Sequence, residues 1–92
     1  MGFVVGEKMW QLGRRHQVMC VTHLPQLAAF GDGHYRVSKH VSEDRTLTGV
    51  EKLGDVERVH ELAQMAGSTG ESSLQAAREL ILQARERQAA AA

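Results

Sequence analysis

The chain has 92 residues, of which 42% are hydrophobic and 24% are charged, so it makes at most one small domain with a modest core. Eleven Lys and Arg residues balance eleven Asp and Glu residues, and a net charge of zero gives no support for nucleic-acid binding by this segment on its own. The single cysteine, Cys20, favours a reducing, cytoplasmic compartment. The sequence has no apolar run of ~18 to 20 residues and no signal-peptide pattern, so we predict a protein without membrane contact.

Residues 4–16 have the apolar spacing of a helix. The stripe is formed by side chains three to four residues apart: Val5, Met9, Leu12 and His16. Arg14 and Arg15 suit the negative end of the helix dipole, and the alternative role for them is a phosphate contact.

Residues 18–22 form a short and nearly all-apolar run. A run of this length without alternation predicts a strand that is covered on both faces, as in a parallel sheet, with Cys20 as a buried thiol. Buried strands of this kind place functional groups just beyond their carboxyl ends. That position is held by His23, whose imidazole is suited to donate to a phosphoryl oxygen or to position an attacking water. The alternative is that His23 only caps the following turn.

The middle of the chain predicts a short helix and a hairpin. Pro25 suits the first turn of a helix over residues 25–30, which Gly31-Asp32-Gly33 ends. Residues 34–41 alternate, 42–44 are polar and 45–53 are β-prone, so the two runs predict an antiparallel hairpin, with Gly49 as a candidate bulge.

Two helices are predicted in the last third. The first spans residues 55–66 after a cap at Gly54 or Asp55, and a break at residues 68–70 separates it from the second. The second carries an apolar stripe formed by Leu74, Ala77, Ile81 and Ala84. Its stretch 83–88 is interpreted as a solvated face.

This order of elements gives an α/β chain with one buried strand and no sister strand to pair with it. A strand with two open edges is prone to pair with another strand. We therefore expect a partner, either a missing half of the sheet or a second copy of the chain. The alternative from another class is a free-standing protein-interaction module that forms a homo-oligomer.

Other functional patterns are weaker. His16, Cys20 and His23 suggest zinc, but a strand residue and a helix end do not converge as a closed site needs, and a fourth ligand at familiar spacing is lacking. A small metal-binding regulator is therefore a third hypothesis. We expect His34, His40 and His60 to be surface or strand-edge residues, and no Gly-x-Ser-x-Gly motif of a hydrolase is present.

The peptide at residues 21–30, Val-Thr-His-Leu-Pro-Gln-Leu-Ala-Ala-Phe, is followed by Val-Ser-Lys and a hairpin. It closely resembles the C-terminal part of the bacterial RecN family, DNA repair ATPases of the ABC and SMC-like class. The helix at residues 5–12 and the Arg-Val-x-Glu-Leu-Ala-x-Met pattern at residues 58–65 resemble the same family. The resemblance covers about residues 4–84.

The resemblance implies that the chain is the C-terminal lobe of a P-loop ATPase head. Its parts would be residues 1–33 with the helix, strand and short helix, 34–53 with the hairpin, and 54–92 with the last helices. It implies that His23 is the switch histidine, which contacts the γ-phosphate of ATP bound with Mg²⁺. It also implies a role in double-strand break repair and recombination, with DNA reached only through the full assembly.

The sequence departs from a complete ATPase head. The Gly-x-x-x-x-Gly-Lys-Ser/Thr loop, a strand ending in Asp-Glu and a Leu-Ser-Gly-Gly signature are all missing from it. In the family these elements lie upstream of the matched segment. We therefore expect no ATPase activity from the chain alone and expect the N-terminal half of the head as its partner.

Overall fold

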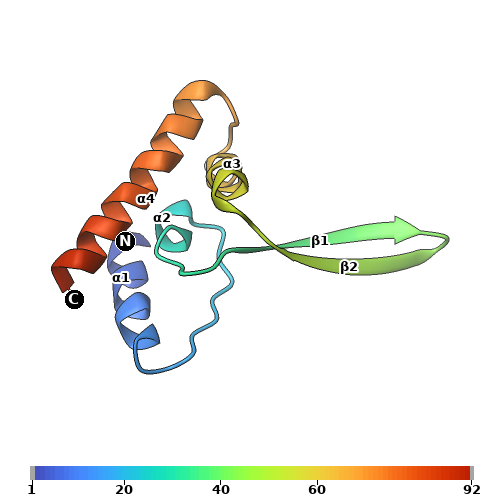
Figure 1. Ribbon diagram of the computed structural model, residues 1–92. Coiled ribbons are helices and arrows are strands. Elements are labelled where there is room, and N and C mark those ends of the chain that lie inside the picture. The colour runs from blue at the N-terminus through green and yellow to red at the C-terminus, as the bar shows by residue number, and fades with distance from the viewer. Residues whose placement is uncertain (1, 92) are drawn as a thin grey trace.

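The structure is a computed structural model that describes residues 2–91. Four helices gather into one body, and a two-stranded hairpin projects from it as an arm (Figure 1). In chain order the elements are α1 (Gly2–Gly13), α2 (Pro25–Ala28), β1 (Tyr35–Ser42), β2 (Arg45–Lys52), α3 (Asp55–Met65) and α4 (Glu71–Ala91). Within residues 2–91 no helix is both long enough and apolar enough to cross a membrane.

In the helical body, α1, α2 and α3 all pack against helix α4 (Figure 1). Its buried stripe is the predicted one in part, since Leu74, Ala77 and Ala84 are buried. Small alanine side chains let the neighbouring helices approach closely, and Leu62 of α3, which is fully buried, fills the space between them. Phe30, just after α2, completes this core.

Helix α1 buries a different face from the one predicted. It spans Gly2–Gly13 instead of residues 4–16, and its buried residues are Gly2 and Gly6. Val5 and Leu12 of the predicted stripe are 42% and 53% exposed. The spacing of apolar side chains did not identify this face, because its packing depends on glycines, which have no side chain. The ring of Phe30 lies where a Cβ on Gly6 would stand, at 2.5 Å from that position.

We expect Gly6→Ala to destabilise the helical body. Alanine favours a helix over glycine by roughly 0.5–1 kcal/mol, but the clash with the Phe30 ring opposes this gain by about 1–3 kcal/mol. Gly13→Ala is the matched control in the same helix, because a Cβ there meets only Val18 Cγ2 at 4.0 Å. Thermal unfolding followed by circular dichroism should show a lower Tm for Gly6→Ala alone. A rise in Tm for both variants would contradict this packing.

The hairpin confirms the predicted pair of strands. It runs in unbroken antiparallel register from Tyr35 opposite Lys52 to Ser42 opposite Arg45. The turn is formed by Glu43 and Asp44, with φ of 49° and 65°, the left-handed backbone that two-residue hairpin turns require. The prediction of a bulge at Gly49 is wrong, because Gly49 lies directly opposite Ser38 without an extra residue. Both faces of the arm are largely exposed.

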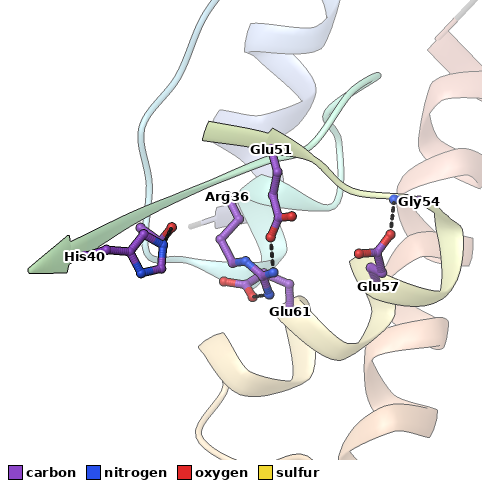
Figure 2. A network of polar contacts seen from close by, with 7 residues as sticks. Arg36, His40, Glu51, Gly54, Glu57 and Glu61 are labelled. Atoms are coloured by element: carbon purple, nitrogen blue, oxygen red, sulfur yellow. Dashed lines mark hydrogen bonds and ion pairs between the residues drawn. The ribbon is translucent and has the colours of Figure 1, made fainter. Parts of the chain in front are cut away.

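Helix α3 begins where the sequence predicts. Gly54 is its N-cap, and the Gly54 N–H donates to Glu57 Oε1 at 3.1 Å (Figure 2). This bond satisfies an amide that the first helical turn leaves without an intrahelical partner. Asp55 and Glu57 also place negative charge at the positive end of the helix dipole.

Candidate functional site

The predicted buried strand at residues 18–22 is not a strand. Residues 17–22 cross from α1 to α2 without regular secondary structure, as the long connection between those helices in Figure 1 shows. Met19 is 87% exposed and Val21 is 97% exposed, and Cys20, predicted to be a buried thiol, is exposed as well. The physical reason is that a strand needs a neighbour for its backbone hydrogen bonds. The sheet within residues 2–91 is the hairpin alone, and it does not pair with this run.

His23 lies at a bend between this run and α2, with its side chain exposed. The turn after it is held by other groups: the Leu24 N–H donates to Thr22 Oγ1 at 3.0 Å, and the Leu24 carbonyl accepts from the N–H groups of Leu27 and Ala28. The short helix begins at Pro25 as predicted, although it ends at Ala28 instead of Phe30. Within this turn the Thr22 hydroxyl, and not the His23 imidazole, accepts a backbone N–H. In the described part of the chain no hydrogen bond engages the imidazole.

Arg58 of α3 fixes the end of α2 that follows His23. Its Nη2 donates to the carbonyls of Ala28 and Ala29 at 3.1 Å and to the carbonyl of Gly31 at 2.7 Å. Burial lowers the pKa of this guanidinium, and the nearby charge of Arg85 lowers it further. A charged donor satisfies helix-end carbonyls more strongly than a neutral one. Three backbone groups of the segment after His23 are thus tied to the third helix.

Helix α4 supports the same segment. The Gln88 side chain donates through Nε2 to the Phe30 carbonyl at 3.1 Å and is half-buried. Arg87 lies over the Phe3 ring, 5.2 Å from its centroid, and pairs with Glu7 at 3.5 Å. The prediction of a solvated face at residues 83–88 is therefore wrong for Gln88. Sequence reasoning missed Arg58 and Gln88 because their acceptors are backbone carbonyls, which leave no pattern in the sequence.

His34 is half-buried and lies directly before β1 at the base of the hairpin, which fits the strand-edge alternative of the prediction and not the surface alternative. Its Nδ1 is buried and has no hydrogen-bond partner within residues 2–91. Burial lowers the pKa of His34, the charge of Arg58 lowers it further, and the carboxylate of Glu61 acts in the opposite direction. The neutral imidazole is therefore the form that the folded chain favours.

This shift makes stability depend on pH with a definite sign. The pKa of His34 in the folded chain lies below its unfolded value near 6.5, so the unfolded state binds the proton more readily. The stabilisation is fully present above pH 6.5 and is lost as pH falls through that value toward the lower folded pKa. Urea unfolding of wild type and His34→Gln between pH 8 and pH 5 should show a smaller loss for the variant. Equal losses in both proteins would contradict the assignment.

Arg36 joins the hairpin to α3 (Figure 2). It pairs with Glu51 on the opposite strand and with Glu61 of α3, at 3.6 Å from Nη1 to Oε2. The same hairpin face brings Ser38 Oγ to 3.2 Å from His40 Nε2. This pair is not a hydrolytic triad, because Glu51 is engaged by Arg36 and no carboxylate bonds to His40 in the region that the structure covers.

The zinc hypothesis finds no geometry in its favour. Between residues 2 and 91 no three side chains of His, Cys, Asp or Glu come together as a metal site requires. His16, Cys20 and His23 lie along the extended connection and the helix end before it.

Comparison with known proteins finds no matching family model, but it does find curated relatives. The chain is 50% identical over 64 residues to the DNA repair protein RecN of Xylella fastidiosa (strain 9a5c), which covers 70% of this chain and 12% of the relative. It is 44% identical over 78 residues to the DNA repair protein RecN of Deinococcus radiodurans, covering 84% of this chain and 14% of the relative. The protein of that name in Vibrio cholerae is 41% identical over 83 residues, covering 88% of this chain and 15% of the relative.

Proposed function

Because the chain matches the C-terminal part of the DNA repair protein RecN over most of its length, we propose that it acts as the C-terminal lobe of an ABC/SMC-like ATPase head in double-strand break repair and recombination. The chain spans about 12–15% of the length of these relatives. The remaining parts of the head would then come from a longer polypeptide or from a partner chain in the cytoplasm.

One observation carries the proposal. The apolar run at residues 18–22 is largely exposed and not paired with a strand, and it leads directly into His23, whose following segment is held by hydrogen bonds from Arg58 and Gln88. Met19 and Val21 are almost fully exposed, and burying two such side chains against a sheet would contribute roughly 1.5–3 kcal/mol each. Such a run is suited to become a strand when a neighbouring strand is supplied. It would then hold His23 at the carboxyl edge of the completed sheet, which is where nucleotides bind in open α/β folds.

In this assembly His23 would donate to a γ-phosphate oxygen or position the attacking water. Its exposed imidazole is not engaged within residues 2–91, which leaves its nitrogen atoms free for such a contact. The ATP, the Mg²⁺ and the phosphate-binding loop would be held by the remainder of the head, since no motif for them occurs in this sequence. This chain would supply the histidine, and Arg58 and Gln88 would fix the segment beyond it.

The experiment is a complementation assay of ATP turnover. The chain alone should show no Mg²⁺-dependent hydrolysis. A RecN relative that lacks the matched segment should be inactive, and it should regain turnover when this chain replaces that segment. Turnover by the pure chain that His23→Ala abolishes would contradict the proposal, as would full activity of the truncated relative.

A second candidate is a free-standing oligomerisation module, which the projecting hairpin favours. Its strands have open edges and exposed apolar side chains, such as Val37 at 64% and Val41 at 78% exposed. Exposed edges of this kind pair readily with a second copy. Light scattering tests both candidates: a monodisperse monomer with a sharp, cooperative melt argues against a lobe that needs its partner and also against a homo-oligomer.

A further inference from the structure

A short turn encloses the backbone of His23, and it is closed by the residue directly before the histidine. The Leu24 N–H donates to Thr22 Oγ1 at 3.0 Å, so His23 is the one residue whose φ and ψ both lie within the hydrogen-bonded ring. Threonine hydroxyls form turns of this kind by taking the place of a backbone carbonyl. The bond therefore restricts the two backbone angles that set the direction in which the His23 side chain leaves the chain.

The far end of this turn is part of α2. Leu24 is the N-cap residue of the helix, with extended backbone at φ −97° and ψ 115°. Its carbonyl accepts from the N–H groups of Leu27 and Ala28 at 3.2 Å and 3.0 Å. The bond from the Leu24 N–H to Thr22 and the bonds to the Leu24 carbonyl thus meet at one residue, and they join the bend at His23 to the first turn of the helix.

The surroundings of His23 offer little else to fix its direction. Residues 17–22 have no regular secondary structure, and the exposed imidazole forms no hydrogen bond within residues 2–91. A group that must meet a transition state is more effective when its geometry is set in advance, because ordering it during the reaction costs conformational entropy. The Thr22 hydroxyl is in a position to supply this order.

We propose that Thr22 is a positioning residue for His23. Its hydroxyl keeps the bend in one conformation and so directs the imidazole toward the γ-phosphate or the attacking water. Thr22 acts through the backbone of His23 and does not itself contact the phosphate. Its effect on hydrolysis rests on the proposed function, whereas the turn itself is present in the chain without a nucleotide.

The test is ATP hydrolysis by a RecN relative that carries this chain in place of its matched segment, with substitutions at Thr22. Thr22→Val keeps the branched shape of the side chain and its preference for strands but loses the acceptor oxygen. It should slow hydrolysis by about 3- to 10-fold, as the loss of one ordinary hydrogen bond would, and leave ATP binding unchanged. Thr22→Ser keeps the oxygen and should hydrolyse ATP at nearly the wild-type rate. Thr69→Val, at an exposed threonine between α3 and α4, is the matched control and should behave as wild type.

A double-mutant cycle shows whether Thr22 acts through His23. Once His23→Ala has removed the imidazole, adding Thr22→Val should slow hydrolysis no further. Hydrogen exchange at the Leu24 amide of the whole chain gives a second readout that needs no ATP. Exchange should be faster in Thr22→Val and should stay at the wild-type rate in Thr22→Ser.

Several results would overturn the positioning role: wild-type hydrolysis in Thr22→Val, an equal loss in Thr22→Ser or Thr69→Val, a full further loss when Thr22→Val is added to His23→Ala, or unchanged exchange at Leu24. Slow hydrolysis in His23→Ala together with normal hydrolysis in Thr22→Val would remove Thr22 alone. Normal hydrolysis in His23→Ala would contradict the proposed function itself, and the role of Thr22 would fall with it.

Discussion

His23→Ala should slow ATP hydrolysis by about 10²–10³-fold in a RecN relative that carries this chain in place of its matched segment. The magnitude is that of removing one hydrogen-bond donor aimed at charge that develops in a transition state. ATP binding should change far less, because most phosphate contacts would come from the remainder of the head. Single-turnover hydrolysis together with equilibrium ATP binding separates the two quantities.

The matched control is His60→Ala, which removes an exposed imidazole from α3 at a distance in sequence from the bend. It should leave both ATP binding and hydrolysis unchanged. If His60→Ala and His23→Ala reduced turnover equally, the loss would reflect a damaged lobe and not a phosphate contact. Unchanged hydrolysis in His23→Ala would remove the imidazole from the mechanism.

Arg58→Ala should lower the free energy of unfolding by about 2–3 kcal/mol. The change removes a charged donor from three carbonyls at the end of α2, and hydrogen bonds to charged groups are worth about 1.5–3 kcal/mol and are not additive. The carbonyls of Ala28 and Ala29, whose bonds to Arg58 are partly buried, would lose this donor. Urea denaturation at pH 7.5 measures the effect, with Arg15→Ala, an exposed residue just beyond the end of α1, as the control.

Arg58→Lys distinguishes hydrogen bonding from charge. Lysine keeps the positive charge, but its ammonium ends one bond short of Arg58 Nη2, the single nitrogen that donates to the carbonyls of Ala28, Ala29 and Gly31. We therefore expect partial rescue. Full stability in Arg58→Ala would show that the α2 carbonyls are satisfied without α3.

Apart from the strand predicted at residues 18–22, the elements of this chain were well predicted from local patterns. The hairpin follows from alternation on either side of a polar turn, and the start of α2 follows from Pro25, because both signals depend on neighbours in the sequence. The family resemblance is confirmed by relatives of 37–50% identity. Local chemistry and a recognisable peptide were sufficient for these features.

The packing was predicted less well, because it depends on contacts between distant residues. The face of α1 was misjudged since Gly6 contributes a contact by its missing Cβ, which an apolar count does not register. The run at residues 18–22 has the composition of a buried strand, but composition does not supply the neighbouring strands that a sheet needs. The half-buried state of His34 was not predicted, and the charges that shift its pKa, Arg58 and Glu61, belong to α3, more than twenty residues further along the chain.

The most direct test of the nucleotide role is the structure of the ATP-bound chimera, in which this chain replaces the matched segment of a RecN relative. We expect residues 18–22 to be paired as a strand within the sheet and the His23 imidazole to lie at hydrogen-bond distance, roughly 3 Å, from a γ-phosphate oxygen or the attacking water. A His23 side chain directed into solvent, with the γ-phosphate held entirely by other residues, would contradict the account.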